Sequence, residues 1–393
     1  MTSKSIVRPT GAILAAAAIT LALSACVANN PAGSSPTLTV DSTADDCVVS
    51  AAVAPSGTVV FDVTNSTDQT TEFYLLADDG LRVVAEIENV APGAPRTLTA
   101  SLAPGSYYTV CKPGMVGGGV GKTEFTVIDS GNSSTPTADE AAQIKAAADN
   151  YVAYVKDQVS QLVPGTQQFL DAYVAGDDTT ARALYPVVRG HYERIETVAE
   201  SFGTLDPQLD FREADVPEGD EWTGWHRLEK DLWPPADAGY VALTPDERAS
   251  FANKLTIDTQ ALYDAVHDPE YTVTIDAISN GAIALLDEVA SGKITGEEEI
   301  WSHTDLSDFQ GNLEGARVAY EGVRAIVERN DPDLVAELDS EFDALQKQLA
   351  AYGSYETGFT PYDKLTSAEV KALADGVNAL AEPLSMLTAT LVA

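Results

Sequence analysis

The chain has 393 residues, of which 45% are hydrophobic and 7% aromatic, so it holds enough apolar material for more than one core and is not a disordered chain. Its 60 acidic residues against 23 basic ones give a formal net charge of -37, which argues against binding nucleic acid, or anionic lipid, through charge. Cations are the natural partners of such a chain, although most of these carboxylates are expected to serve solubility only.

The N-terminus carries the pattern of a targeting segment. Two basic residues precede an apolar run over residues 11–22, and Leu-Ser-Ala-Cys follows at residues 23–26. This resembles a bacterial lipoprotein signal, so we predict a signal peptide over 1–25, lipidation of Cys26 and a location on the outer face of the cell membrane. A transmembrane anchor is the alternative, but the run is short for spanning a bilayer. Residues 26–37 are expected to be a tether.

Residues 38–128 are predicted to form a small all-β domain. Short stretches rich in β-branched and aromatic residues are separated by turn signals such as Pro55-Ser56-Gly57, a spacing typical of a β-sandwich. The expected strands cover residues 37–40, 47–53, 58–64, 72–76, 81–87, 96–102, 106–111 and 123–128.

This part resembles a cupredoxin-like domain, in which Glu72 stands where the family often has a histidine and Cys111 ends the penultimate strand. A blue-copper site with two histidines is excluded, because no histidine precedes His191. Two interpretations of Cys47 and Cys111 stay open. They form a disulfide, as exported proteins often do, or they stay reduced and form a second metal site with Glu72, for copper or iron.

A polar linker over residues 129–137 leads into an all-α domain, residues 138–393, predicted to be a set of up-down helical bundles. Thr244 and Thr366 each begin a Thr-x-x-Glu capping box, which marks a helix start. The expected helices cover about 138–163, 166–175, 179–202, 223–231, 246–267, 270–291, 297–329, 333–352 and 367–391.

His226 and Glu229 are three residues apart in one predicted helix, so both side chains leave the same face and can close on one cation. By itself His-x-x-Glu is weak evidence, since it more often marks a solvated pair or a satisfied helical histidine. Glu193 and Glu196 have the same spacing and repel each other. A cation between them would remove the repulsion, and the alternative is screening by nearby arginines or solvent.

Several segments together resemble the imelysin-like domain of EfeO-type iron-uptake lipoproteins. The segments are residues 191–196, 210–213, 224–230, 302–310 and 362–365. The resemblance covers essentially the whole mature chain. It implies a lipoprotein that binds iron outside the membrane and hands it to a permease, with a haem peroxidase as a further partner.

The ligands that this resemblance implies are Glu193, Glu196, Asp210, His226 and Glu229. Four carboxylates and one imidazole form a hard, anionic site that suits Fe(III) or Fe(II).

A further histidine, His303, together with Asp305 and Asp308, is a weaker candidate for the lining of the same cleft.

Two other functions compete with iron delivery. Imelysin-type domains have been grouped with peptidases, yet the His-Glu-x-x-His motif of helical zinc peptidases is absent. Binding of an acidic polysaccharide conflicts with the charge of -37 unless a metal ion bridges the two. Oxidation of Fe(II) in the β-domain is an optional activity that only the resemblance suggests.

Overall fold

The structure, a computed structural model, describes residues 37–78, 80, 83–115, 119–129, 138–217, 219–236 and 239–391. All of them belong to one compact unit. The predicted signal peptide, the lipidation site at Cys26, the tether up to residue 36 and the linker from residue 130 lie outside the described residues.

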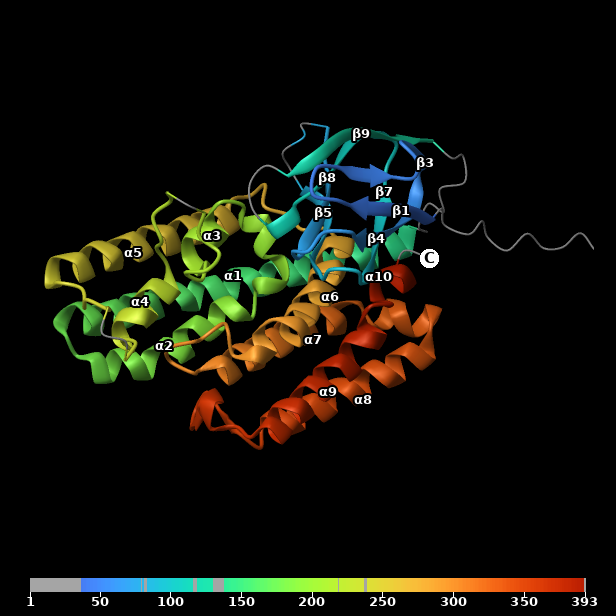
Figure 1. The fold of residues 1–393 in the computed structure, drawn as a ribbon. Helices are drawn as coiled ribbons and strands as arrows, with labels where there is room; N and C mark the ends of the chain where they lie inside the picture. Colours follow the sequence, from blue (N-terminus) through green and yellow to red (C-terminus); the bar gives the residue numbers. More distant parts are fainter. Residues whose placement is uncertain are drawn as a thin grey trace, which may run out of the picture. The chain divides into compact units, whose positions relative to one another are not determined.

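The N-terminal part is a β-domain of two sheets (Figure 1). One sheet has the order β2 (Cys47–Val49), β1 (Thr37–Ser42), β4 (Gly57–Asn65) and β7 (Pro95–Leu102). The other has the order β3 (Val53–Pro55), β9 (Val120–Ile128), β8 (Gly105–Cys111), β5 (Thr71–Leu76) and β6 (Val83–Val90). The predicted order of fold classes, an all-β sandwich followed by a helical domain, is confirmed.

Side chains from both sheets form the core of the β-domain. The ring of Phe61, on β4, lies 5.3 Å from that of Phe73 on β5 and 5.6 Å from that of Phe125 on β9, measured between ring centroids. Strand β1 alternates between exposed and buried residues along its whole length, as a strand with one face on a core should.

One predicted strand, residues 47–53, is wrong as a single element. It divides into β2, which pairs with β1, and β3, which pairs with β9 in the other sheet. The chain therefore changes sheets at residues 50–52. A run of β-forming residues cannot reveal such a switch, because local propensity does not specify the partner strand.

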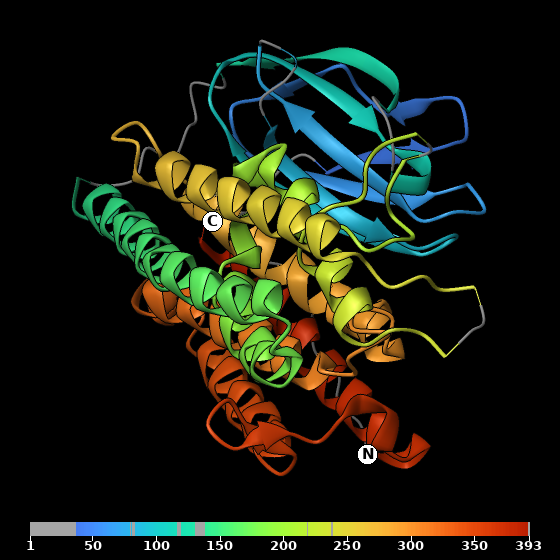
Figure 2. The ribbon, with the colours of Figure 1, turned by 90° about the vertical axis from the view of Figure 1, so that its left-hand side faces the viewer.

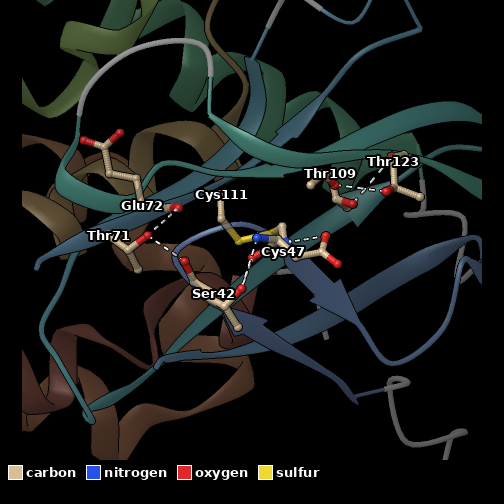
Figure 3. Close-up of a disulfide and its surroundings, with 10 residues drawn as sticks. Ser42, Cys47, Thr71, Glu72, Thr109, Cys111 and Thr123 are labelled. Atoms are coloured by element: carbon tan, nitrogen blue, oxygen red, sulfur yellow. Dashed lines mark hydrogen bonds between the residues drawn. A yellow bond between two sulfur atoms is a disulfide. The ribbon is translucent and has the colours of Figure 1, made fainter. Parts of the chain in front are cut away.

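The sulfur atoms of Cys47 and Cys111 form a disulfide with a Cα–Cα distance of 5.3 Å, joining the start of β2 to the end of β8 (Figure 3). This corrects the expectation of a second metal site, because a disulfide sulfur is not a thiolate and does not act as a thiolate ligand for copper or iron. Glu72 points away from the disulfide and accepts a hydrogen bond of 2.7 Å from the Tyr74 hydroxyl.

The helical part contains ten α-helices among the described residues. They are α1 (Ala138–Ala175), α2 (Asp178–Glu193), α3 (Leu205–Asp210), α4 (Trp225–Leu232), α5 (Pro245–His267), α6 (Ile275–Ser291), α7 (Asp305–Asn330), α8 (Pro332–Leu349), α9 (Ser367–Leu384) and α10 (Leu387–Leu391). A small hairpin, β10 (Gly353–Ser354) and β11 (Gly358–Phe359), lies between α8 and α9. The long helix α1 packs against α2 and α5 (Figures 1 and 2). None of the described helices is long and apolar enough to cross a membrane.

Several helix boundaries differ from those predicted from the sequence. The helix α1 continues through Pro164, where a break was expected. The capping boxes at Thr244 and Thr366 are both confirmed. Three predicted helices are clearly shorter than expected: α2 ends at Glu193 and gives way to a 3₁₀ helix, η2 (Glu196–Phe202), α6 begins only at Ile275, and α7 begins only at Asp305. The helix expected over residues 367–391 is divided into α9 and α10.

Two glycines of α7 allow this helix to approach the end of α2. A Cβ atom at Gly311 would lie 2.5 Å from the Cβ of Glu193, and one at Gly315 would lie 2.4 Å from the carbonyl oxygen of Arg194. Real Cβ atoms do not come so close to other heavy atoms. This close approach places the start of α7 beside the acidic residues at the end of α2.

Candidate metal centre

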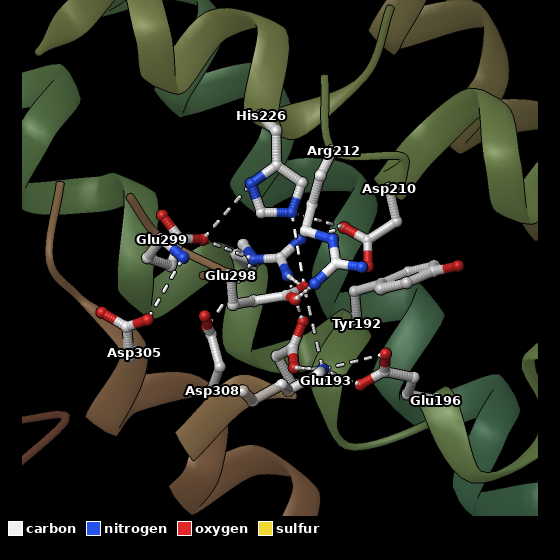
Figure 4. A network of polar contacts seen from close by, with 12 residues as sticks. Tyr192, Glu193, Glu196, Asp210, Arg212, His226, Glu298, Glu299, Asp305 and Asp308 are labelled. Atoms are coloured by element: carbon white, nitrogen blue, oxygen red, sulfur yellow. Dashed lines mark hydrogen bonds and ion pairs between the residues drawn. The ribbon is translucent and has the colours of Figure 1, made fainter. Parts of the chain in front are cut away.

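A buried cluster of charged side chains lies where the end of α2, the end of α3, the start of α4 and the start of α7 meet (Figure 4). A second 3₁₀ turn, η3 (Lys293–Thr295), and the residues after it complete the cluster. Its members are Arg189, Glu193, Glu196, Asp210, His226, Glu229, Lys293, Glu298, Glu299, Asp305 and Asp308.

Gly224 places His226 in this cluster. It has a φ of 86°, which favours glycine, and a Cβ atom there would lie 2.2 Å from the carbonyl oxygen of Leu209. The start of α4 therefore lies directly against α3, and His226 and Asp210 come within reach of each other. The side chain of His226 is fully buried.

The imidazole of His226 has carboxylates on both sides (Figure 4). Its Nε2 lies 3.7 Å from Oδ1 of Asp210 and 3.5 Å from Oε1 of Glu298. Its Nδ1 lies 3.2 Å from Oε2 of Glu229 and 3.9 Å from Oε1 of Glu299. Each side offers three ligand atoms close enough together to hold one metal ion.

The Nδ1 and Nε2 sides of the imidazole differ in their hydrogen bonds. Oε1 of Glu229 accepts hydrogen bonds from the backbone N–H groups of Trp301 and Ser302, at 3.0 and 2.7 Å. Those bonds fix the carboxylate that faces Nδ1, so we assign the Nδ1 proton to the hydrogen bond with Glu229. The other nitrogen, Nε2, is buried and has no hydrogen-bond partner among the described residues. The imidazole is thus oriented on one side, and on the other its Nε2 faces the carboxylates of Asp210 and Glu298.

The surroundings of His226 favour its protonated form. Burial and the nearby Arg189 oppose the charge, but the hydrogen bond to Glu229 and the nearby carboxylates of Glu298 and Glu299 outweigh them and raise the pKa of His226 to about 10. A cation that binds at Nε2 must therefore displace a proton, as metal binding to histidine generally does near its pKa.

Asp210 and Glu298 also line a cavity of about 510 Å³, and Glu298 lines a second one of about 410 Å³. Arg212 lines both cavities and lies 3.6 Å from Oε2 of Glu298 through its Nη1 atom. Two of the carboxylates that face Nε2 therefore reach open space, whereas His226 itself is fully buried.

Glu193 and Glu196 meet a cation, and that cation is a lysine. The buried ammonium of Lys293 lies 3.2 Å from Oε2 of Glu193 and 2.8 Å from Oε2 of Glu196. The amide of Asn312 donates to the same two oxygens, at 2.9 and 2.7 Å. The expected screening by an arginine is also present, because Arg189 lies 2.8 Å from Oε1 of Glu193.

Arg189 is the second buried cation of the cluster. Its guanidinium pairs with Asp210 and lies 3.0 Å from Glu298 and 2.8 Å from Glu299. Such a concentration of buried carboxylates is tolerable only with internal counter-charges. Burial opposes ionisation of Glu298, yet Lys293 together with His226 and Arg189 holds the pKa of this carboxyl well below its usual range.

The five ligands that the resemblance implied all belong to this cluster. Asp210 and Glu229 lie on either side of the His226 imidazole, while Glu193 and Glu196 lie at Lys293.

Asp305 and Asp308 are fully buried in the cluster, but His303 is partly exposed and belongs to neither group of ligand atoms. Asp305 accepts a hydrogen bond of 3.2 Å from the backbone N–H of Glu299, and Asp308 lies 3.6 Å from Arg189.

Sequence reasoning missed Glu298, Glu299 and Lys293. The two glutamates stand in a run of three, residues 297–299, which as a pattern indicates a solvated surface. In the structure Glu297 is exposed, while Glu298 and Glu299 are buried. Their ion pairs with Arg189 set the two buried glutamates apart.

The fold and the cluster define a class of protein, one with a β-domain and a helical domain that encloses a candidate cation centre. Comparison with known proteins places the helical domain in a known family. The imelysin family matches residues 147–387, which include every member of the cluster.

Among similar proteins, the iron uptake system component EfeO of Yersinia pestis is 36% identical over 348 residues, 88% of each chain. The protein of the same name from Escherichia coli strain K12 is 35% identical over 359 residues, 91% of this chain and 92% of the relative. The chain therefore belongs to the EfeO family of iron uptake system components and carries an imelysin domain.

Proposed function

We propose that this protein captures an iron ion, Fe(II) or Fe(III), between Asp210, His226 and Glu298 and delivers it to a membrane permease. The observation that carries the proposal is the fully buried imidazole whose Nε2 faces two carboxylates and has no hydrogen-bond partner in the part of the chain that the structure describes. A family of iron uptake components supports iron as the cation.

The spacing of the ligand atoms supports a metal ion. Metal–ligand bonds of about 2.1 Å place neighbouring ligand atoms roughly 3–3.5 Å apart. The distances from Nε2 of His226 to the nearest oxygens of Asp210 and Glu298, 3.7 and 3.5 Å, are close to that value. Oxygen ligands with one imidazole suit iron better than Cu(I).

Glu229 is proposed to act through the imidazole. A carboxylate that accepts the N–H of a metal-binding histidine fixes its orientation and raises its basicity. The direct ligation predicted for Glu229, Glu193 and Glu196 stays a prediction, with Lys293 already paired to the last two.

The finer biology is also part of the proposal. Lipidation at Cys26 would hold the protein at the outer face of the cell membrane, where a permease receives the iron and a haem peroxidase acts with it. The family of iron uptake components supports partners of this kind in general terms.

The test is titration of the mature protein with Fe(II) without oxygen, and with Fe(III), Cu(II) and Zn(II). We expect tight iron binding in the wild type and a loss of affinity of about 100-fold or more in His226→Ala and in Asp210→Asn. The matched control is His267→Ala, because His267 ends α5 and belongs to neither group of ligand atoms.

Iron binding that survives both substitutions at the centre would refute the proposed site. Binding of zinc alone, with zinc-dependent cleavage of a peptide, would favour a peptidase instead.

A further inference from the structure

We propose that Lys293 occupies the position of a second metal ion, so that the centre binds one metal ion beside His226 and none between Glu193 and Glu196. This inference rests on the proposed function, since it concerns how many ions the same centre holds. In this proposal the positive charge of Lys293 limits the number of metal ions that each protein molecule binds to one.

The ammonium of Lys293 has the contacts of a bound cation. It is fully buried, and it lies 3.0 and 2.8 Å from the two carboxylate oxygens of Glu196 and 3.2 Å from Oε2 of Glu193. Three contacts match the three N–H donors of an ammonium group. Lys293 thus replaces the metal ion that the spacing of the two glutamates suggested.

The oxygens of this glutamate pair are also occupied from another side. Nδ2 of Asn312 donates to Oε2 of Glu193 and to Oε2 of Glu196. It donates further to the backbone carbonyl of Glu193, at 3.1 Å. With an ammonium and an amide on the same two oxygens, few lone pairs remain for a metal ion.

The backbone holds Lys293 in this place. The turn η3 closes with a hydrogen bond of 2.9 Å from the N–H of Gly296 to the carbonyl of Lys293, and Gly296 has a φ of 77°. The hydroxyl of Tyr362 donates to the carbonyl of Ile294 at 2.6 Å. Moving the ammonium of Lys293 out of the centre would break these ion pairs and leave buried carboxylates unpaired, which costs free energy.

The imidazole side also holds a buried cation, because Arg189 pairs with Oδ1 of Asp210 and Oε1 of Glu298, but it differs from the lysine side at one nitrogen. Nε2 of His226 has no hydrogen-bond partner among the residues described, and Glu298 next to it borders two cavities. Oε1 of Glu298 lies 3.5 Å from Nε2 and 3.8 Å from the Lys293 ammonium, so it stands between the two cation positions. A second dication beside the ammonium would meet a like charge in a buried place.

The experiment counts Mn(II) bound to the full mature protein by the loss of the free-ion signal in electron paramagnetic resonance. We expect one equivalent in the wild type, lost in Asp210→Asn. Lys293→Met removes the ammonium and should bind two equivalents, and the second should disappear again when Glu196→Gln is added. Lys293→Arg, which keeps the charge, should bind one.

The matched control is Lys145→Met, because the Lys145 side chain is 74% exposed and is paired to Asp149 outside the centre. It should bind one equivalent with wild-type affinity. Glu196→Gln alone tests the inference without touching the lysine, and its dissociation constant for Mn(II) should stay within threefold of the wild type.

The outcomes separate the inference from the function on which it rests. No binding in the wild type, or binding that Asp210→Asn does not change, refutes the proposed site. One equivalent in folded Lys293→Met, or a loss above tenfold in Glu196→Gln, refutes the role of Lys293 alone. If Lys293→Met does not fold, the number of Mn(II) ions bound by the wild type still tests the inference. Two equivalents in the wild type, both lost in Asp210→Asn, would overturn it.

Discussion

His191 is a histidine that the fold keeps neutral. Its Nδ1 lies 2.8 Å from Oε1 of Gln158, and burial together with Arg194 lowers the pKa of His191 from 6.5 to about 4. The unfolded chain therefore binds more protons than the folded one between pH 6.5 and pH 4, and stability falls as the pH falls through that window.

His191→Gln removes this proton uptake. Between pH 7.5 and pH 5 the wild type should lose about 2 kcal/mol of unfolding free energy through His191 that the variant keeps. Urea unfolding of both proteins at the two pH values measures the difference. Equal losses in wild type and variant would mean that His191 is not kept neutral.

At the scale of the element, α7 carries two glycines that should respond in opposite ways to alanine. Gly315 lies against the backbone of Arg194, so Gly315→Ala should cost about 1–3 kcal/mol despite its better helix propensity. A Cβ added at Gly322 would have no atom of the described residues within 4 Å apart from its own stretch of helix, so Gly322→Ala should gain about 0.5–1 kcal/mol. Thermal unfolding of the pair compares them on one helix, and a gain in both would contradict the close packing of α7 against α2.

The disulfide between β2 and β8 should stabilise the β-domain. It closes a sequence separation of 64 residues, for which the loss of chain entropy in the unfolded state amounts to about 4 kcal/mol. Cys47→Ala combined with Cys111→Ala should lower the stability of the β-domain by an amount of this order. Metal binding should persist, because every residue of the proposed centre lies in the helical domain. Loss of iron binding in the folded double variant would show that the sulfurs contribute to it.

At the scale of the whole molecule, a bound ion should stabilise the folded state. With free metal at 100 times its dissociation constant, linkage predicts a gain of about 2.7 kcal/mol in unfolding free energy. Differential scanning calorimetry with and without Mn(II) measures this gain, which His226→Ala should abolish and His267→Ala should retain. A gain that persists in His226→Ala would point to another site.

The sequence by itself determined the division into a β-domain and a helical domain, the capping boxes at Thr244 and Thr366, and the pairing of His226 with Glu229. These features depend on residues near each other in the chain, where the periods of strands and helices fix which side chains share a face. The spacing also singled out Glu193 and Glu196, and the resemblance added Asp210 and implied that all three are ligands; all three lie in the cluster.

Only the tertiary structure decided which cations and carboxylates meet. Lys293 reaches Glu196 across 97 residues, and Glu298 reaches Arg189 across 109. It also decided that Cys47 pairs with Cys111 across 64 residues. Such contacts depend on how helices and sheets pack, and a charged residue looks alike in sequence whether packing buries it or leaves it in water.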